Sequence, residues 1–126
     1  QAVPQSIGEI MRVVYLSLAM KYRFALEQIS KCTKKTYGKI YMVGGGTRDT
    51  LLSQITADVC GIPVTTGPVE ATVMGNAAIQ LLKCGAIGSE KAIPSIIRKS
   101  EKLYDFTPEK NYDNEYESFK NIIRKR

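Results

Sequence analysis

Three consecutive glycines, Gly44, Gly45 and Gly46, are the residues of this chain most suited to close contact with a ligand. A β-like run at 40–43 precedes them, and apolar residues with helical spacing begin at Leu51. A turn without side chains between a strand and a helix leaves backbone N–H groups open to a flat or anionic molecule. The turn therefore favours a nucleotide, although its spacing is neither G-x-G-x-x-G nor that of a P-loop. A tight turn that needs positive φ and binds nothing is the alternative.

Other residues with catalytic or metal-binding chemistry are sparse. The chain has no histidine, which excludes a Ser-His or Cys-His triad within it. Its cysteines, Cys32, Cys60 and Cys84, are odd in number and widely spaced, so they favour neither a disulfide framework nor a zinc site. Each lies near the end of an expected helix, where we expect a small buried side chain in a reducing cytoplasm. We assign no catalytic role to Asp58 or to Glu70, which lies where a helix start favours a carboxylate.

Composition is that of one soluble domain with a core: 126 residues, 44% hydrophobic and 24% charged. No apolar run approaches the ~18 residues of a membrane span, so we expect no membrane partner. The net charge is +6, with basic clusters at 31–39, 98–102 and 120–126. These clusters could bind nucleic acid, but no aromatic stacking platform is interleaved with them. We interpret them as solvated helix ends and a tail, and expect no nucleic-acid partner.

The elements that would position the glycine turn alternate in type. Helices are expected at 6–32, at 48–60 and from Gly67-Pro68 to Gly85, with strands at 40–43 and 63–65. This order predicts a parallel pair of strands in an α/β layer. Two strands make a poor sheet, so the pattern also predicts further strands, either upstream in a longer protein or from a neighbouring chain.

Local signals define the helix ends. Ser6 with Glu9 forms a capping box, Gly61 stands at a left-handed C-cap, and Pro68 stands at a first helical position. The first helix is apolar over most of its circumference and needs cover on more than one side. Gly75 within the third helix suggests that another backbone packs against it. The third helix has an apolar stripe that we expect to be buried: Val73, Ala77, Leu81 and Leu82.

The last third is less regular. Pro94 opens an expected helix that extends to about Leu103, residues 104–108 form an extended link, and residues 110–124 form a terminal helix. One face of that helix carries Tyr112, Tyr116, Phe119 and Ile123. We therefore divide the chain into a portion at 1–108 and a terminal helix with a basic tail at 109–126.

Several spaced motifs together resemble the C-terminal domain of the FGGY carbohydrate kinases. The resemblance covers roughly residues 6–108 and is strongest at 40–85. Within the family, the Gly-Pro lead and the Gly-Asn pair are similar to the kinases of L-rhamnulose. The matching segments are Val43-Gly44-Gly45-Gly46, Leu51-Leu52-Ser53-Gln54, Ala57-Asp58, Gly61-Ile62-Pro63-Val64, Gly67-Pro68-Val69-Glu70-Ala71-Thr72 and Gly75-Asn76.

The resemblance implies an actin-like, ribonuclease-H-like domain that lacks its first three antiparallel strands. It implies a protein that transfers the γ-phosphate of ATP to a sugar hydroxyl with Mg²⁺, and L-rhamnulose 1-phosphate as the product. In this family the catalytic aspartate, the phosphate loops and the sugar pocket lie earlier in the chain. We therefore expect catalysis to need the rest of the kinase chain and this fragment alone to be inactive.

Residue roles follow only where the motif matches. Gly44, Gly45 and Gly46 resemble the family's adenosine motif, with Gly45 as the first candidate for ATP contact and Gly46 as the second. Many members have asparagine where this chain has Asp49. An ionised aspartate cannot donate a hydrogen bond, so we expect Asp49 to cap the following helix rather than contact adenine.

Other functions remain open at this point. A kinase for a different sugar, a non-catalytic nucleotide-binding or regulatory actin-like domain, and a basic nucleic-acid-binding domain all fit parts of the pattern. The last predicts strong salt-dependent binding to DNA or RNA. The absent strands also leave apolar surface on the first helix and first strand, so the fragment is expected to self-associate.

Overall fold

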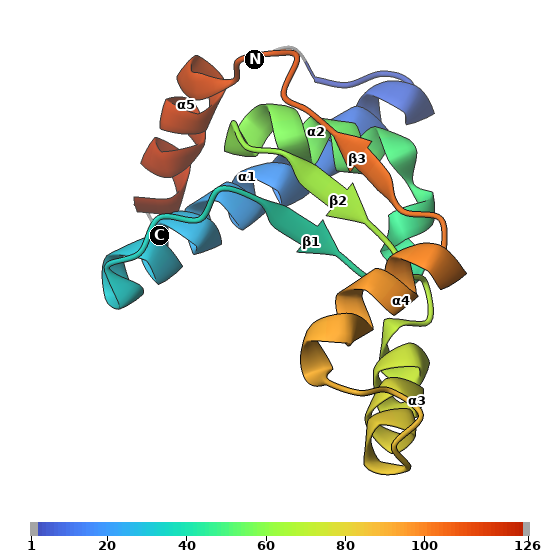
Figure 1. Ribbon diagram of the computed structural model, residues 1–126. Coiled ribbons are helices and arrows are strands. Elements are labelled where there is room, and N and C mark those ends of the chain that lie inside the picture. Colours follow the sequence, from blue (N-terminus) through green and yellow to red (C-terminus); the bar gives the residue numbers. More distant parts are fainter. Residues whose placement is uncertain (1–2, 125–126) are drawn as a thin grey trace.

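The structure is a computed structural model that describes residues 3–124. Figure 1 shows the path of the chain from an N-terminal helix, through a small sheet, to a C-terminal helix. In chain order the elements are α1 (Ile7–Thr33), β1 (Ile40–Met42), the 3₁₀ turn η1 (Gly45–Arg48), α2 (Thr50–Cys60), β2 (Val64–Thr66), α3 (Ala71–Lys83), the 3₁₀ turn η2 (Glu90–Ala92), α4 (Ile93–Ser100), β3 (Tyr104–Phe106) and α5 (Asp113–Arg124).

The sheet has the order β1-β2-β3. β1 and β2 run parallel, which confirms the predicted parallel pair and the α/β class. β3 pairs antiparallel with β2 and falls in the stretch that we predicted to be an extended link rather than a strand of the sheet. Aspartate is unfavourable in strands, so the residue types at 104–106 do not predict a strand. In the fold, Asp105 accepts hydrogen bonds from the Thr65 hydroxyl and, at 3.0 Å, from Lys39 Nζ.

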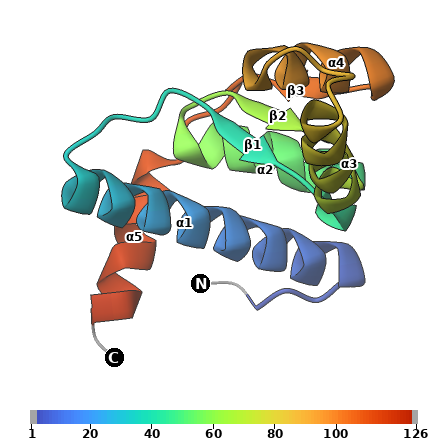
Figure 2. The same ribbon diagram turned by 60° about the horizontal axis from the view of Figure 1, so that its bottom comes forward.

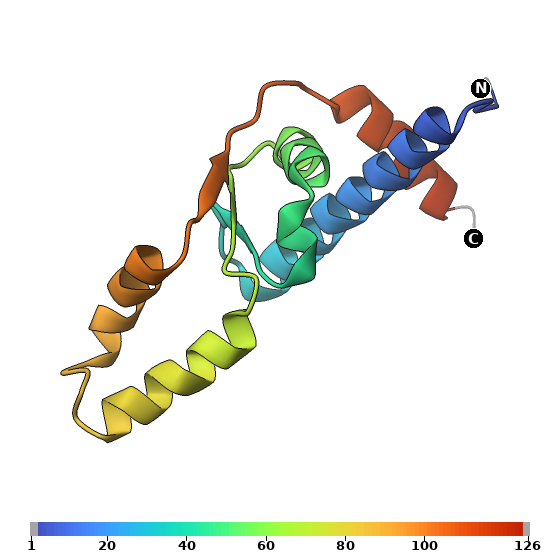
Figure 3. The same ribbon diagram turned by 90° about the vertical axis from the view of Figure 1, so that its right-hand side faces the viewer.

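The helices are distributed unevenly about the sheet. α1 and α2 lie together on one side of it, and α5 crosses α1 (Figures 1 and 2). α3 and α4 extend away from this body (Figure 3). The core lies between α1, α2 and α5, because its buried members come from those three helices. They are Ala19, Met20, Ile55, Val59 and Tyr116.

The predicted caps are present. Glu9 donates its N–H to Ser6 Oγ at 3.2 Å, and Ser6 donates its N–H to Glu9 Oε2 at 3.1 Å, which completes the capping box of α1. Gly61 ends α2 in the left-handed conformation. These local signals act within a few residues, so the rest of the fold does not override them.

The predicted start of the third helix at Pro68 was wrong. α3 begins at Ala71, and Glu70 occupies the N-cap without a side-chain cap bond. The chain before it instead stays paired beyond β1. The Gly67 N–H donates to the Met42 carbonyl at 2.9 Å, and the Gly44 N–H donates to the Pro68 carbonyl at 3.2 Å. A residue held in this extension of the sheet cannot also form the first helical turn.

The expected burial of α3 was also wrong. Val73 is 63% exposed, Leu81 and Ala77 are exposed, and Leu82 is half-buried. An added Cβ at Gly75 would meet no atom within 4 Å, so no backbone packs there. The reason is visible in Figure 3, where α3 projects away from the sheet and the core helices.

The cysteine prediction was wrong for two of the three residues. Cys32 and Cys84 are exposed, and Cys60 is half-buried. Cys32 lies in the last turn of α1, and Cys84 is the C-cap residue of α3. Burial raises the pKa of the Cys60 thiol to about 11, so this thiol stays protonated at neutral pH.

Apolar surface is exposed along α1 and at β1, as predicted. Ile7 is 82% exposed, and Tyr41 on β1 is 61% exposed. In the part of the chain that the structure describes, β1 also has no strand partner on the side opposite β2. No helix among residues 3–124 is long and apolar enough to cross a membrane.

Candidate functional site

The glycine turn sits where β1 ends and α2 is about to begin. Gly44 has φ 87°, a left-handed conformation that favours glycine. Its carbonyl accepts two bonds from Thr47, from the N–H at 3.1 Å and from Oγ1 at 2.7 Å. Thr47 is buried, so this pair of bonds holds the turn from the inside. The tight-turn interpretation therefore accounts for Gly44.

The same interpretation does not account for the next two glycines. Gly45 and Gly46 are exposed, and neither has a positive φ. A Cβ built on either residue would meet no atom within 4 Å. Nothing in the described chain therefore requires glycine at these two positions. Their backbone faces open space, which suits a flat ligand or another body that must approach closely.

Asp49 positions the helix that follows. Its Oδ1 accepts the Leu52 N–H at 2.9 Å, which confirms the predicted capping role. Its Oδ2 accepts a hydrogen bond from the Tyr15 hydroxyl on α1. The Leu52 N–H, followed by the Tyr15 hydroxyl, lowers the pKa of Asp49. The carboxylate is therefore ionised, and each of its oxygens accepts a hydrogen bond from within the chain.

Ser53 fixes the first turn of α2 against the sheet. Its hydroxyl donates to the Asp49 carbonyl at 2.8 Å and lies 3.6 Å from Met42 Sδ. Ser53 is fully buried. The glycine turn is thus held between a strand end, a capped helix and the Tyr15 contact from α1.

An apolar groove of about 380 Å³ adjoins the glycine turn. Gly46 and Val43 border it from the turn, and Tyr22, Leu26 and Ile29 border it from α1. Its walls carry few polar groups, so the groove accepts apolar atoms more readily than a phosphate. Any polar contact of a ligand here would have to come from the bare backbone of the turn.

The two remaining carboxylates have different surroundings. Asp58 is buried, and its Oδ1 accepts from Gln54 Nε2 at 2.9 Å and from the Glu109 N–H at 2.8 Å. Asp58 therefore ties the chain before α5 to α2. Glu70 is exposed at the start of α3. Neither residue lies in the glycine turn.

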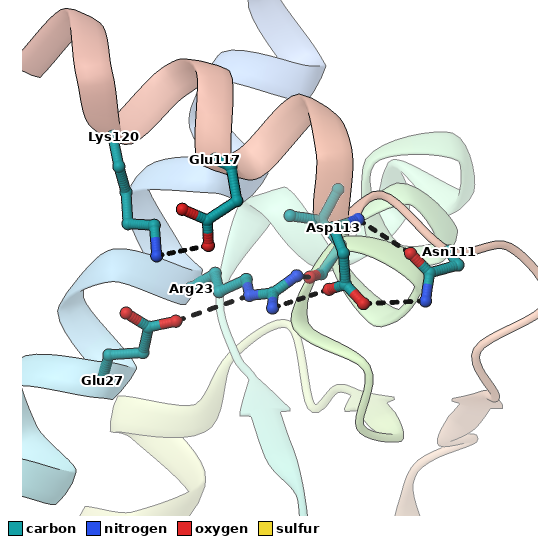
Figure 4. Close-up of polar contacts among 7 residues, drawn as sticks. Arg23, Glu27, Asn111, Asp113, Glu117 and Lys120 are labelled. Atoms are coloured by element: carbon teal, nitrogen blue, oxygen red, sulfur yellow. Dashed lines mark hydrogen bonds and ion pairs between the residues drawn. The ribbon is translucent and has the colours of Figure 1, made fainter.

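The sequence analysis missed two residues whose side chains join distant parts of the chain. Tyr15 is one, because 34 residues separate it from Asp49 and no local spacing connects them. Arg23 is the other, and Figure 4 shows its contacts between α1 and α5. It pairs with Asp113 Oδ1 at 2.8 Å and donates to the Val59 carbonyl at 3.0 Å. Its guanidinium lies 4.2 Å from the centre of the Tyr116 ring.

Among residues 3–124, no group of three or more His, Cys, Asp or Glu side chains gathers in a way that could hold a metal ion. The donor set of the glycine turn is backbone, which fits a nucleotide rather than a cation.

Comparison with known proteins gives a family match. Residues 1–84 match the model described as the FGGY family of carbohydrate kinases, C-terminal domain. A rhamnulokinase of Bacteroides thetaiotaomicron is 36% identical over 126 residues, covering 98% of this chain and 26% of that protein. Rhamnulokinases of two Klebsiella pneumoniae strains are 36% and 35% identical over 119 residues, covering 94% of this chain and 24% of each relative.

The chain thus spans about a quarter of the length of the curated relatives that it matches. The family model covers the glycine turn, its capped helix and α3 up to Cys84. The resemblance read from the motifs is therefore confirmed. This chain belongs to the FGGY family of carbohydrate kinases and contains a C-terminal domain segment of that family.

Proposed function

We propose that this chain forms the adenosine-binding wall of an ATP-dependent sugar kinase that converts L-rhamnulose to L-rhamnulose 1-phosphate. The wall is the turn Gly44–Gly46, with Gly45 as the first contact and Gly46 as the second. The α/β segment belongs to an actin-like, ribonuclease-H-like domain whose first strands pair with the free edge of β1. Residues 1–108 belong to that domain, and residues 109–126 add a terminal helix and basic tail in a cytoplasmic enzyme.

One observation carries the nucleotide part of this proposal. Gly45 and Gly46 have ordinary φ values and open space where a side chain would be. Replacing glycine by another residue in a helical turn normally lowers the entropy cost of folding. A sequence that keeps two glycines without a structural need for them favours a ligand that requires the bare backbone.

The apolar groove beside the turn supports a nucleobase more than a phosphate. Gly46 borders the groove, and Val43 and Leu52 continue its wall. An adenine ring could place one face on these side chains and its edge against the backbone of the turn. The phosphates would then extend away from the groove, toward parts of the kinase outside this chain.

The sugar is supported by the relatives alone. The three relatives described above match over almost the whole chain and are named rhamnulokinases. A kinase of the same family for another sugar is the alternative. No residue of this chain is assigned a contact with the sugar.

The requirements of phosphoryl transfer indicate which part of the reaction this chain can support. The reaction needs in-line positioning, charge stabilisation and a base near the sugar hydroxyl. When bound, Mg²⁺ supplies charge neutralisation on the phosphates. This chain supplies only orientation of the nucleotide, through the backbone of Gly44–Gly46 held by Thr47, Asp49 and Tyr15. The 126-residue chain alone is therefore expected to phosphorylate no sugar.

The test uses the protein expressed from its native gene, with Gly45→Leu as the main variant. The added side chain would occupy the open space before the turn and weaken ATP binding about tenfold or more, as measured by calorimetry. Gly8→Leu is the matched control, because Gly8 is also exposed with no atom near its Cβ position, but lies at the start of α1. The control is expected to bind ATP like the parent.

Equal ATP affinity in the parent and Gly45→Leu would overturn the adenosine-wall proposal. The sugar is tested separately, by ATP-dependent phosphorylation of L-rhamnulose compared with other ketoses. Turnover of a different sugar would overturn only the L-rhamnulose assignment. Tight ATP binding without turnover of any sugar would favour the non-catalytic nucleotide-binding alternative.

A further inference from the structure

A second cavity lies next to the 3₁₀ turn η1, separate from the apolar groove. Its volume is about 270 Å³, and it shares no lining residue with the groove. Three segments form it: the η1–α2 junction, the end of β2, and the chain between α4 and β3. The residues that carry the argument are Thr47, Arg48, Thr66, Glu101, Lys102 and Tyr104.

Thr66 is the most informative of these residues. It is 1% exposed, and its Oγ1 has no hydrogen-bond partner among residues 3–124. Two other buried threonine hydroxyls are bonded: Thr47 Oγ1 donates to the Gly44 carbonyl and Thr56 Oγ1 to the Leu52 carbonyl. Among the described residues the Tyr116 hydroxyl also lacks a partner, but it lies in the helical core and lines no part of this cavity. A buried hydroxyl without a partner is unfavourable, so one at a cavity wall indicates a missing polar partner.

The charged side chains around the cavity have no ion-pair partner among the described residues. They are Arg48, Lys102 and Glu101. Two cations and one carboxylate leave a net positive charge at this wall. The wall therefore favours an anion that also carries hydroxyl groups, since Glu101 and Thr66 can both bond to hydroxyls.

The wall is held in place by close packing at Gly67. This residue has φ 101°, and an added Cβ would lie 3.0 Å from Leu103 Cδ2 and 3.5 Å from the Lys102 carbonyl. The end of β2 therefore touches the segment that carries Glu101 and Lys102. A preformed wall reduces the ordering cost of binding a small molecule.

We infer that this cavity binds a small phosphorylated polyol. Its phosphate lies between Arg48 and Lys102, and a hydroxyl group reaches the Thr66 side chain. Tyr104 covers the ligand from one side, with the Lys102 ammonium 5.1 Å from its ring centre. The cavity is small for a ligand site, which limits the ligand to a few carbon atoms.

The test is an NMR titration of the full 126-residue chain with glycerol 3-phosphate, in the absence of ATP. Amide shifts are expected at Thr47, Thr66 and Tyr104. Glycerol, which lacks the phosphate, and methyl phosphate, which lacks the hydroxyls, are each expected to bind about tenfold more weakly. Because no nucleotide is present, the result is independent of the proposed ATP wall.

Lys102→Gln is expected to weaken glycerol 3-phosphate binding about tenfold, through loss of one charge-assisted contact. Lys99→Gln removes the same charge from the last turn of α4, outside the cavity, and is expected to bind like the parent. Equal weakening by both variants would reduce the effect to net charge and overturn the site. Equal affinity for glycerol 3-phosphate and methyl phosphate would overturn the polyol assignment.

Discussion

The Tyr15 hydroxyl on α1 donates a hydrogen bond to Oδ2 of Asp49, whose other oxygen caps α2 through the Leu52 N–H. One carboxylate thus joins the long first helix to the helix that follows the glycine turn. The contact leaves Asp49 Oδ1 and Oδ2 both occupied. The orientation of the turn relative to α1 therefore depends on a tyrosine that no motif identifies.

Removing the Tyr15 hydroxyl tests this link. Tyr15→Phe keeps the ring and is expected to lower the free energy of unfolding by about 1–2 kcal/mol, because a hydrogen bond to a charged acceptor is lost. Urea unfolding measures the change. A double-mutant cycle with Asp49→Asn, which keeps a capping oxygen, isolates the pair. Additive effects of the two substitutions would contradict the link.

The same contact makes stability depend on pH. The Leu52 N–H and the Tyr15 hydroxyl lower the pKa of Asp49 in the folded state, below its value in the unfolded chain. The stabilisation is then present above the unfolded pKa of about 4 and is lost as the pH falls through the folded pKa. Tyr15→Phe is expected to flatten this acid-side loss. Unfolding curves between pH 7 and pH 3 give the comparison, and parallel pH profiles for parent and variant would contradict it.

The contacts of Arg23 hold α5 against α1 and the end of α2. Arg23 bonds to the Val59 carbonyl, pairs with Asp113 and covers the ring of Tyr116, which is fully buried. Arg23→Ala is expected to destabilise the docking of α5 by about 1–3 kcal/mol, since a buried carbonyl and an aromatic face lose their partner. Hydrogen exchange should therefore accelerate in α5 more than in β2.

Arg12→Ala is the control for that experiment. Arg12 is an exposed arginine of the same helix and forms no ion pair within residues 3–124. We expect it to leave exchange in α5 unchanged. Equal acceleration in every element of Arg23→Ala would indicate global destabilisation instead of a local clamp.

Thiol labelling provides an independent check of the core. Cys32 and Cys84 are exposed, whereas burial raises the pKa of Cys60 to about 11. Because the thiolate is the reactive form, we expect iodoacetamide at pH 8 to label Cys32 and Cys84 well before Cys60. Peptide mass spectrometry separates the three sites. Rapid labelling of Cys60 in the native protein would contradict the packing of α1 against the end of α2.

Sequence signals predicted the local features of this fold better than its long-range ones. The capping box at Ser6, the Asp49 cap and the Gly61 C-cap need only neighbours a few residues away, and all three are present. The strand at 104–106 was missed because its pairing depends on partners about 40 residues earlier, including the Thr65 contact to Asp105. Distant partners leave no trace in local periodicity.

The candidate site shows the same difference between local features, which were predicted, and long-range contacts, which were not. The glycine turn was predicted from three adjacent residues, and the structure explains Gly44 by its φ value while leaving Gly45 and Gly46 without an internal reason. Tyr15, Arg23 and Thr66 were not predicted. Each of them acts through a residue or segment far away in sequence, so only the folded arrangement identifies them. The burial of α3 was overestimated because periodicity shows an apolar face but not what covers it.

The exposed apolar face of α1 predicts self-association of the 126-residue chain. Ile7, Ile10 and Val13 are 82%, 48% and 51% exposed, and they occupy the first half of one helix. Transfer of apolar surface from water into a protein contact lowers the free energy. Concentration-dependent dimers or larger species are therefore expected in sedimentation experiments. Ile10→Glu should shift the population toward monomer, whereas Ile79→Glu, at an exposed apolar position on α3, away from α1, should not. A chain that stays monomeric at high concentration, or an equal shift from both variants, would show that α1 is not the contact surface.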